Sequence, residues 1–333
     1  MKILVIQKKM MGDILMSSVL FKQLRQKFPQ ANLHYLISKM GHDVVLNNPT
    51  INDYIFFDDY DFPRLLKKIK SENYDYIIDA YGKTATAILS FLSGAKSISY
   101  RKGYTQFFYN QTIKRRSQHQ SIVTTKAIEH RLQLLEPLGI SFEEVVPDIF
   151  ITPTEKESAI ESLRDCGVND DDKLIMISTF GSNESKTYPL NYMAQVIEQV
   201  AAFPVKVILN HRAGEEEKVE KIKSFLSRGA QQKIVEGVQL NSLRKFIGVC
   251  SRCAALIGNE GGSTNISKAL RVPTFSVFAP FVGKDGWFWG ENGTTNVSVH
   301  VRDFISDSEK QNHENFKPVL FKELLNEFLE RNL

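Results

Sequence analysis

An acid and two glycines follow an apolar run late in the chain, in a pattern that suits phosphate binding. The stretch GNEGGSTNISKALRVPTFSVFAP, residues 258–280, opens with five residues of interest: Glu260, Gly261, Gly262, Ser263 and Thr264. Residues 254–257 predict a buried strand and residues 263–270 a helix. A helix start offers free N–H groups to anions, and glycine allows close approach. The alternative is a tight turn whose hydroxyl residues cap the helix.

A second glycine and acid lie near the start of the chain. Residues 2–6 predict an apolar strand, and the loop after it, QKKMMGDIL, places Gly12 and Asp13 where a helix begins. An acid in this position is often a helix cap. Opposite a phosphate site, the same carboxylate would be a candidate general base for a hydroxyl group. Both interpretations of Asp13 stay open at this point.

Strands and helices alternate along the chain, which predicts parallel sheets covered by helices. In the first half we expect further strands at 33–37, 54–57 and 74–79, and helices at 13–28 and 125–138. After a polar run at 169–172, we expect strands at 173–178, 205–209 and 254–257, and helices at 190–202, 215–226, 242–250 and 263–270. These are two Rossmann-like units, and such sheets bind ligands at the carboxyl ends of their strands.

The length of 333 residues fits two domains of roughly 150 residues each. We expect an N-terminal domain over 1–155 and a C-terminal domain over 156–315. The final segment, 316–333, contains PVLFKELLNEFLERNL, whose apolar residues recur at helical spacing. We expect this amphipathic helix to pack back towards the N-terminal domain.

The composition is that of a soluble globular protein, with 42% hydrophobic and 24% charged residues. A net charge of +4 and a pI of about 8.7 are well below the basic profile of nucleic-acid-binding proteins, and they allow an anionic substrate. The N-terminal apolar run is too short for a signal peptide, and no stretch reaches 18 apolar residues. We therefore expect a cytoplasmic protein that does not bind nucleic acid.

Two patterns have the spacing of metal ligands. Cys250 and Cys253 form a C-x-x-C, but the sequence offers no second ligand pair for zinc. Asp59 and Asp61 form a D-x-D in a polar loop, where acids commonly cap a helix or face solvent. We expect neither a metal nor another cofactor.

The two glycine motifs, taken together, resemble those of glycosyltransferase family 9, the ADP-heptose:lipopolysaccharide heptosyltransferases. The resemblance spans nearly the whole chain and rests on GDILMSSVLFKQLRQKFPQANLHYLIS, on HRLQLLEPLGI at 130–140, on SKTYP at 185–189 and on the stretch at 258–280. It implies an α/β protein of the GT-B fold, with two Rossmann-like doubly wound parallel-sheet domains facing a central cleft. The first domain would bind the acceptor and the second the nucleotide sugar.

The resemblance also implies roles for single residues. Asp13 falls on the family's catalytic acid, Lys186 on its nucleotide-contacting lysine, and Glu215 on an acid near the ribose. For Glu215, a solvated helix start is the alternative. The donor would be contacted by Gly12, Lys186, Glu215, Glu260, Gly261, Gly262, Ser263 and Thr264. Departures from the family pattern, with Val19 for Pro, Glu260 for Asp and Asn265 for His, leave the donor sugar open.

A segment rich in basic and aromatic residues, KSISYRKGYTQFFYNQTIKRRSQHQ, lies at 96–120. In an acceptor-binding domain, such cations would meet the carboxylates and phosphates of an anionic glycolipid. The alternative is a solvated loop. The candidate residues are Arg101, Lys102, Lys114, Arg115 and Arg116.

Together these observations predict an inverting, metal-independent glycosyltransferase. It would move a heptose from ADP-heptose to a lipopolysaccharide or lipooligosaccharide inner-core acceptor, at the cytoplasmic face of the inner membrane. Asp13 would deprotonate the acceptor, and Lys186 with the N–H groups of the glycine turn would stabilise the leaving diphosphate. The alternatives are another nucleotide-activated sugar, or a catalytically idle nucleotide-binding module, for which a base at Asp13 would be unnecessary.

Overall fold

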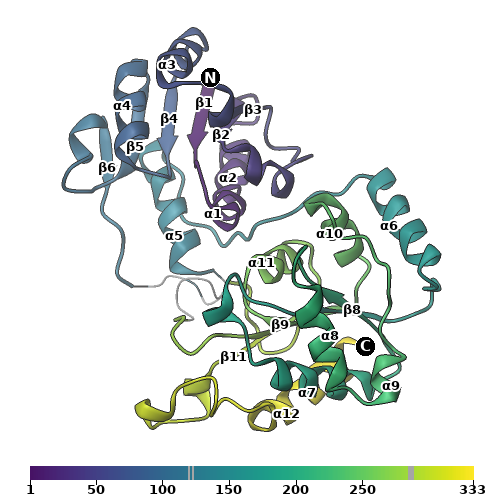
Figure 1. Cartoon of the computed structure of the whole chain (residues 1–333). Helices are drawn as coiled ribbons and strands as arrows, with labels where there is room; N and C mark the ends of the chain where they lie inside the picture. Colours follow the sequence, from purple (N-terminus) through teal and green to yellow (C-terminus); the bar gives the residue numbers. More distant parts are fainter. Residues whose placement is uncertain (119–120, 122–123, 284–288) are drawn as a thin grey trace. The chain divides into compact units, whose positions relative to one another are not determined.

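A computed structural model describes residues 1–118, 121, 124–283 and 289–333 of the chain (Figure 1). The chain divides into two compact units, unit 1 over 1–150 and unit 2 over 151–333. None of the helices in the described ranges combines the length and hydrophobicity that crossing a bilayer requires.

Unit 1 is built on a parallel sheet with the strand order β3-β2-β1-β4-β5-β6. The strands are β1 (Lys2–Ile6), β2 (Asn32–Ile37), β3 (Asp53–Phe56), β4 (Tyr76–Asp79), β5 (Lys96–Tyr100) and β6 (Gln111–Ile113). Residues Ile3 to Ile6 of the central strand β1 are fully buried. Because successive side chains point to opposite faces, this sheet is covered on both sides, as is usual for parallel sheets.

The helices of unit 1 form the two covering layers. They are α1 (Met11–Ser17), α2 (Val19–Lys27), α3 (Phe62–Ser71), α4 (Thr84–Ser93) and α5 (Lys126–Leu132). Helices α3 and α4 contact each other, and α5 contacts both α1 and α2. Leu65 and Ile69 of α3 pack with Leu4 and Ile6 in one of the two hydrophobic layers.

Two predicted helices of unit 1 differ from the observed ones for local reasons. The predicted helix 13–28 is divided at Ser18, whose N–H and hydroxyl both donate to the carbonyl of Leu15, three residues earlier. This bonding tightens the turn. The predicted helix 125–138 becomes a 3₁₀ helix after Leu132, over Gln133–Leu138, and Pro137 lies within that part.

Unit 2 contains a second parallel sheet with the order β11-β10-β9-β7-β8. Its strands are β7 (Leu174–Ser178), β8 (Lys206–Asn210), β9 (Ala255–Asn259), β10 (Thr274–Val277) and β11 (Asn296–Val299). Its helices are α6 (Pro153–Asp165), α7 (Leu190–Ala201), α8 (Glu216–Ser224), α9 (Arg228–Gln231), α10 (Leu243–Cys250), α11 (Gly262–Ala269) and α12 (Lys322–Asn332). Contacts of α7 with α8, α9 and α12, and of α10 with α6 and α11, define the two layers.

The C-terminal helix α12 belongs to the core of unit 2. Its residues Leu325, Phe328 and Leu329 are buried in the same cluster as strands β7, β9 and β10. The sequence predicts this helix but directs it to the N-terminal domain, because an amphipathic pattern identifies an apolar face and not the partner of that face. The expected separate segment 316–333 is therefore part of unit 2.

An aromatic cluster connects the C-terminal segment to the middle of unit 2. Tyr188 is buried, its hydroxyl donates to the carbonyl of Phe316, and the two ring centroids lie 5.8 Å apart. The ring of Phe321 lies 5.4 Å from that of Phe316 and 5.9 Å from that of Phe275 in β10. The residues directly before Tyr188, which include Lys186, are thus supported by the C-terminal segment.

Candidate active site

In unit 1 the topology defines where a ligand would bind. The chain proceeds from β1 to β2 and β3 on one side, then returns to β4 on the other side of β1. Ligands of such sheets bind beyond the carboxyl ends of the two strands where the order reverses. These ends carry the loop 7–10 after β1 and the turn 80–83 after β4. Gly12 and Asp13 lie in the first turn of α1, directly after the first of these loops.

Asp13 is held by a buried arginine. Its Oδ1 accepts a hydrogen bond from Nη2 of Arg131 at 2.6 Å, and its Oδ2 accepts from the N–H of Met10 at 3.3 Å. The side chain of Asp13 is 30% exposed, whereas that of Arg131 is 9% exposed. One carboxylate oxygen is thus committed to the arginine, and the other has a single long hydrogen bond at a partly open surface.

Arg131 is itself fixed by two further hydrogen bonds within unit 1. Its Nε donates to Oγ of Ser17 at 2.8 Å, and its Nη1 donates to the carbonyl of Ala127 at 2.6 Å. Arginine does not lose its proton in proteins, so the positive charge beside Asp13 is permanent. Sequence reasoning missed this role, although a charged residue between the buried positions Ile128 and Leu132 was the available signal.

The turn after β4 is organised by a second buried acid, Asp79. Its Oδ1 accepts from the N–H groups of Tyr81 at 3.0 Å and Gly82 at 2.8 Å, and its Oδ2 accepts from the Tyr109 hydroxyl at 2.7 Å. Burial raises the pKa of the Asp79 carboxyl. Because all its bonds are internal, Asp79 shapes the turn.

Some of the predicted acceptor residues gather near this turn. Nζ of Lys102 donates to the carbonyl of Gly82 at 2.9 Å, and burial together with the charges of Arg115 and Lys83 lowers the Lys102 pKa. The guanidinium of Arg115 lies 4.1 Å from the ring centroid of Tyr100. The charges of Lys83 and Arg115 therefore act on Lys102 here.

The other three predicted acceptor residues are placed differently. Arg116 forms an ion pair with Glu136, with 2.6 Å between Nη2 and Oε1. Arg101 and Lys114 are exposed and have no ion pair within the described ranges. Of the five predicted cations, the structure thus brings Lys102 and Arg115 together at the turn and leaves Arg101 and Lys114 in solvent.

Unit 2 repeats the topological arrangement with different chemistry. Its order reverses between β7, which leads to β8, and β9 on the other side. Asn259 ends β9 and ties the two strands together: its Nδ2 donates to the carbonyls of Ser178 at 3.0 Å and Thr179 at 2.8 Å, and its Oδ1 accepts from the N–H of Tyr188 at 2.7 Å. Asn259 lies within the quoted stretch, but its structural role was not predicted.

The glycine turn lies directly after Asn259. Gly261 precedes α11, Gly262 is the first residue of this helix, and no side chain caps it. A Cβ at Gly261 would have no atom within 4 Å, whereas one at Gly258 would lie 2.5 Å from the Ser178 carbonyl oxygen. Gly258, whose φ is +129°, is thus the glycine that the fold requires. The space at Gly261 is open to a ligand.

The hydroxyl groups of the turn are engaged within the protein. Oγ of Ser263 hydrogen-bonds Oγ of Ser178 at 2.8 Å, and Oγ1 of the buried Thr264 donates to the Asn259 carbonyl at 3.5 Å. The first N–H groups of an α-helix have no partner within the helix. A phosphate at this turn would therefore be bound mainly by backbone N–H groups.

Glu260 and Lys186 lie beside the turn. Burial raises the pKa of the Glu260 carboxyl, and the charges of Lys186 and Lys268 oppose that rise. Lys186 ends a 3₁₀ helix over Glu184–Lys186, and its N–H donates to Oδ1 of Asn183 at 3.0 Å. Its backbone passes so near Gly181 that a Cβ there would lie 2.5 Å from the Lys186 carbonyl oxygen. Lys186 is thus the half-buried cation at this end of the sheet.

A buried ion pair lies on the other side of α11, and sequence reasoning did not find it. Nζ of Lys268 lies 2.7 Å from Oε1 of Glu291 and donates to the carbonyl of Trp289 at 3.0 Å. Burial lowers the Lys268 pKa, which Glu291 opposes. Nε1 of Trp289 donates to Oδ1 of Asn265 at 2.7 Å. The side chains of α11 therefore hold residues 289–291. Asn265, where the family pattern has His, takes part through its hydrogen bond with Trp289.

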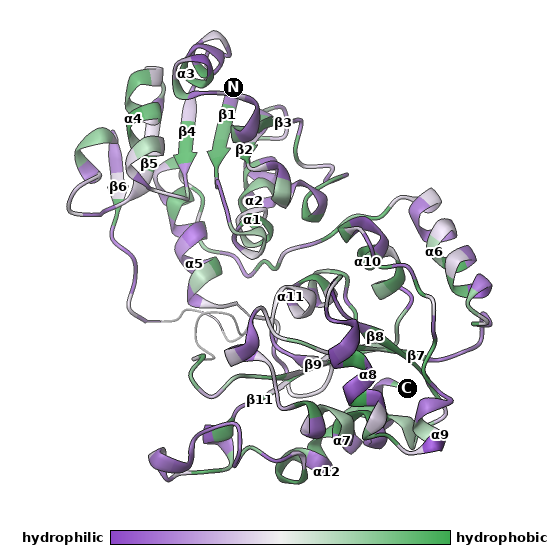
Figure 2. Cartoon of the chain, in the orientation of Figure 1, coloured by the Kyte–Doolittle hydropathy of each residue, from purple (hydrophilic) through white to green (hydrophobic). Residues whose placement is uncertain are grey.

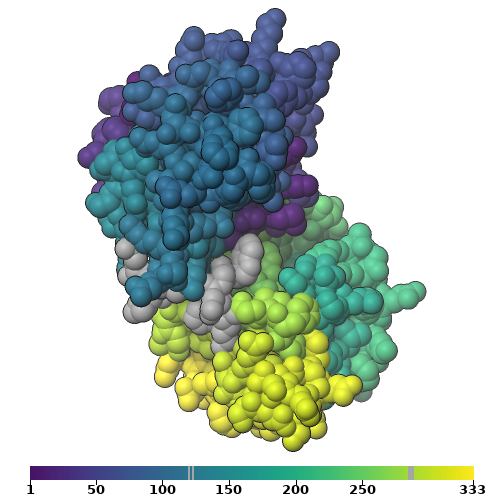
Figure 3. All heavy atoms as spheres, turned by 90° about the vertical axis from the view of Figure 1, so that its left-hand side faces the viewer, coloured from purple at the N-terminus to yellow at the C-terminus, as the bar shows by residue number. Residues whose placement is uncertain are grey.

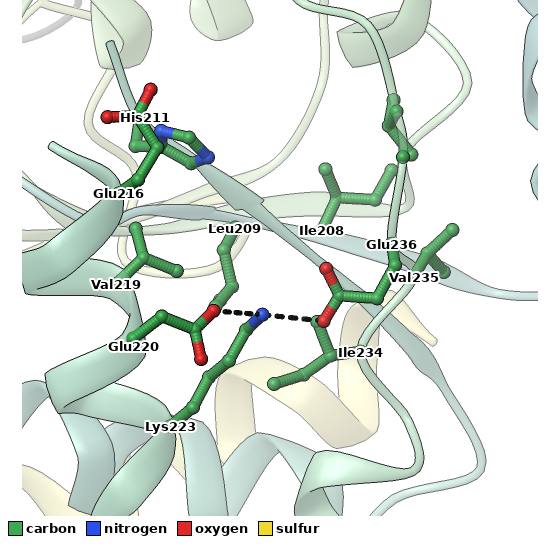
Figure 4. Close-up of a pocket in the computed structure, with 12 residues that line it drawn as sticks. Ile208, Leu209, His211, Glu216, Val219, Glu220, Lys223, Ile234, Val235 and Glu236 are labelled. Atoms are coloured by element: carbon green, nitrogen blue, oxygen red, sulfur yellow. Dashed lines mark hydrogen bonds and ion pairs between the residues drawn. The ribbon is translucent and has the colours of Figure 1, made fainter. Parts of the chain in front are cut away.

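Glu215 lies at the start of α8, where its Oε2 accepts from the N–H of Arg212 at 2.7 Å. The next residue, Glu216, lines a pocket of about 210 Å³ between β8, α8 and residues 234–238. In this pocket Lys223 lies between Glu220 and Glu236, at 2.8 and 2.6 Å (Figure 4). The lining also includes Leu209, Val219 and Ile234, so both apolar and charged side chains line this pocket.

The two patterns with the spacing of metal ligands have structural uses. Asp61 caps α3 by accepting from the N–H of Arg64, and Asp59 forms an ion pair with Lys39. Cys250 and Cys253 are buried, and burial raises the pKa of the Cys250 thiol to about 12. Within the described ranges, no cluster of three His, Cys, Asp or Glu side chains has the arrangement of a metal site.

Comparisons with known proteins agree with the fold. The sequence model of glycosyltransferase family 9 (heptosyltransferase) matches residues 62–313. Lipopolysaccharide heptosyltransferase 1 of Campylobacter coli is 23% identical over 293 residues, which cover 84% of each chain. The structure of E. coli ADP-heptose lps heptosyltransferase II has a TM-score of 0.76 at 17% identity and covers 99% of both chains. E. coli heptosyltransferase WaaC with ADP-2-deoxy-2-fluoro heptose has a TM-score of 0.73 at 16% identity over 100% of both. The predicted pair of GT-B-type parallel-sheet domains is confirmed.

Proposed function

Because the chain belongs to glycosyltransferase family 9, we propose that it transfers a heptose from ADP-heptose to an inner-core acceptor of lipopolysaccharide. The observation that carries this proposal is the position of the Asp13 carboxylate, just after β1, where the strand order of unit 1 reverses. Arg131 holds one of its oxygens, and the other lies at a partly open surface. A hydroxyl group bound there would meet an oriented acceptor for its proton. The donor class is supported by the relatives named above, one of which was solved with an ADP-heptose analogue.

In the proposed reaction Asp13 takes the proton of the acceptor hydroxyl as its oxygen attacks the anomeric carbon of the donor. The bond between that carbon and the diphosphate oxygen breaks, and the electron pair leaves with the diphosphate. The backbone N–H groups of Gly262 to Thr264 and the ammonium group of Lys186 stabilise this charge. A single displacement of this kind inverts the anomeric configuration.

We assign the nucleoside to the side of unit 2 that carries Glu215. Glu215 would accept from the ribose hydroxyls, and the neighbouring pocket, which apolar and charged side chains both line, would hold the base. In unit 1, we assign Lys83, Lys102 and Arg115 to the anionic groups of the acceptor, because the charges of Lys83 and Arg115 act on Lys102 at the turn after β4. With an acceptor that bears phosphates and carboxylates, we place the reaction at the cytoplasmic face of the inner membrane.

A second candidate is transfer of a different nucleotide-activated sugar. It is favoured by two positions at which the sequence departs from the family pattern. Glu260 has a longer side chain than the usual Asp, and Asn265, in place of His, hydrogen-bonds Trp289 and the carbonyl of Gly261. The unfolding temperature, measured separately with ADP, UDP, GDP and CDP, shows which nucleotide the protein binds. A ligand at about 100 times its Kd should add roughly 2.7 kcal/mol of stability. Stabilisation by UDP or GDP without ADP would overturn the ADP-heptose donor.

The catalytic claim is tested by mass spectrometry of a truncated lipopolysaccharide after incubation with ADP-heptose. The expected product is heavier by one heptose residue. A protein that binds ADP but never adds the sugar to any core acceptor would be an idle nucleotide-binding module.

A further inference from the structure

Unit 1 presents an exposed aromatic face that the proposed reaction does not use. Four large side chains of α4 and of the segment between β5 and β6 are between 39% and 78% exposed, and we call them the aromatic face: Phe91, Leu92, Tyr104 and Phe107. The ring of Phe91 meets that of Phe108 edge to face at 6.0 Å, so this segment packs on α4. Hydrophobic colours gather over α4 and beside β6 (Figure 2).

The chain around the aromatic face contains no acid. Between residues 80 and 128 there is neither Asp nor Glu, but there are eight cations: Lys83, Lys96, Arg101, Lys102, Lys114, Arg115, Arg116 and Lys126. The other 284 residues hold 34 Lys and Arg against 38 Asp and Glu, a net charge of −4. The positive charge of the protein therefore comes from this stretch. Of the eight, only Arg116 forms an ion pair among the described residues.

This segment covers one side of unit 1. In Figure 3, which looks at the side of α4 and β6, its blue atoms form the surface of unit 1 that faces the viewer. The side chain of Lys102 connects the segment to the turn after β4, through its hydrogen bond to Gly82. The aromatic face and the cations without an ion pair thus lie on one segment of the chain.

We propose that the aromatic face docks unit 1 on an anionic lipid bilayer. Aromatic side chains are favoured at the headgroup level, and each nearby Lys or Arg is attracted by anionic lipids. A second copy of this chain fits the face poorly, because it would present the same cations and repel them. The inference goes beyond the proposed sugar transfer, since it concerns a lipid surface without an acceptor.

Co-sedimentation with vesicles tests this proposal on the full chain. We expect the parent protein to bind vesicles of equal parts phosphatidylcholine and phosphatidylglycerol, to bind phosphatidylcholine alone much less, and to be released by salt. The double variant Phe91→Ser, Phe107→Ser should lose about tenfold or more in vesicle affinity, because two of the three exposed rings are removed. Phe225→Ser is the matched control, since Phe225 is 49% exposed but lies in unit 2.

Three outcomes would overturn the proposal. The parent could ignore anionic vesicles, the double variant could bind them as the parent does, or the double variant could abolish a self-association seen by sedimentation velocity. Phe107→Trp gives a second readout that does not require the double variant to fold. Because Phe107 is 78% exposed, this single substitution should leave the fold intact. Its fluorescence should shift to the blue with anionic vesicles, and that of Phe225→Trp should not.

These vesicles contain no acceptor and the assay no nucleotide, so the result is independent of the proposed reaction. Neither Phe91 nor Phe107 belongs to the proposed catalytic or binding residues. The double variant should keep its rate on an acceptor dispersed in detergent and lose rate on the same acceptor in anionic vesicles. Equal losses on both would assign the aromatic face to substrate binding or folding.

Discussion

Each sheet has a place where its strand order reverses, between β1 and β4 in unit 1 and between β7 and β9 in unit 2. The two places are equivalent in the fold but differ in the kind of group that they present. In unit 1 a side chain is presented: Asp13 is oriented by Arg131 and keeps one oxygen at the surface. In unit 2 the side chains of Ser263, Thr264 and Asn265 are engaged within the protein, and the space beside Gly261, where α11 begins, is open. The difference suits the two proposed tasks, because a proton needs one ionisable acceptor and a diphosphate needs several fixed donors.

The largest effect that this comparison predicts is on turnover at Asp13. Asp13→Asn keeps the shape but removes the proton acceptor, so kcat should fall by about 10²-fold or more while the donor Kd stays near that of the parent. Steady-state rates and calorimetric titration of the nucleotide measure both. Asp61→Asn, an exposed helix cap of the same unit, is the control. If the Asp13 variant kept most of its turnover, Asp13 would not be the proton acceptor, and the proposed difference between the two units would fail.

A smaller effect is expected at the arginine that orients this carboxylate. Arg131→Lys keeps the charge and loses the planar fork that reaches Asp13, Ser17 and the Ala127 carbonyl together, so kcat should fall roughly tenfold with little change in donor Kd. Arg25→Lys is the matched control, since the Arg25 guanidinium also binds backbone carbonyls but no carboxylate. If the Arg131 and Arg25 variants lose stability alike and neither loses kcat, Arg131 supports the fold alone.

In unit 2 the comparison predicts a loss of binding without a loss of stability. Gly261→Val introduces a side chain into space that is open in the protein, so the unfolding temperature should stay constant while the donor Kd rises about tenfold. Gly258→Ala is the counterpart, because its new Cβ would meet the Ser178 carbonyl at a positive φ. It should cost about 1 to 3 kcal/mol of stability. An unchanged nucleotide affinity in Gly261→Val would reduce the glycine turn to a structural element.

The smallest predicted effect concerns pH and Glu260. Burial raises the pKa of this carboxyl above its value in the unfolded chain, so the folded state binds its proton more tightly. The parent therefore loses stability as the pH rises from about 4.5 through the pKa of the folded state. Glu260→Gln avoids this loss and should unfold at a higher temperature than the parent at pH 7, with the difference vanishing at acid pH. Parallel melting curves at all pH values would contradict a buried, ionising Glu260.

The alternation of strands and helices could be predicted from the sequence because each element carries its own pattern. Residues 174–177 of β7 are all apolar, and the ends of helices carry glycine or proline, as at Gly139. The break at Ser18 could not be predicted, because it depends on a hydroxyl bonding to a carbonyl one turn earlier. Local patterns thus give the type of an element more reliably than its continuity.

The parts of the candidate site that were missed depend on residues distant in sequence. Arg131 meets Asp13 across 118 residues, and Lys268 meets Glu291 across 23. The residues next to Arg131 or Lys268 in the sequence do not indicate which distant acid each of them binds. The glycine turn and Asp13 could be proposed from the sequence because a strand, a turn and a helix lie consecutively there.

The cluster around Tyr188 has a consequence for how the protein would respond to the proposed nucleotide. The main-chain N–H of Tyr188 binds Asn259, beside the glycine turn, and its hydroxyl binds Phe316 in the C-terminal segment. A nucleotide that binds the folded turn therefore opposes the local unfolding of residues that lie more than 50 positions further along the chain. Protease digestion that begins at the C-terminus should accordingly slow when ADP is present, so the last helix acts as a reporter of occupancy at the turn.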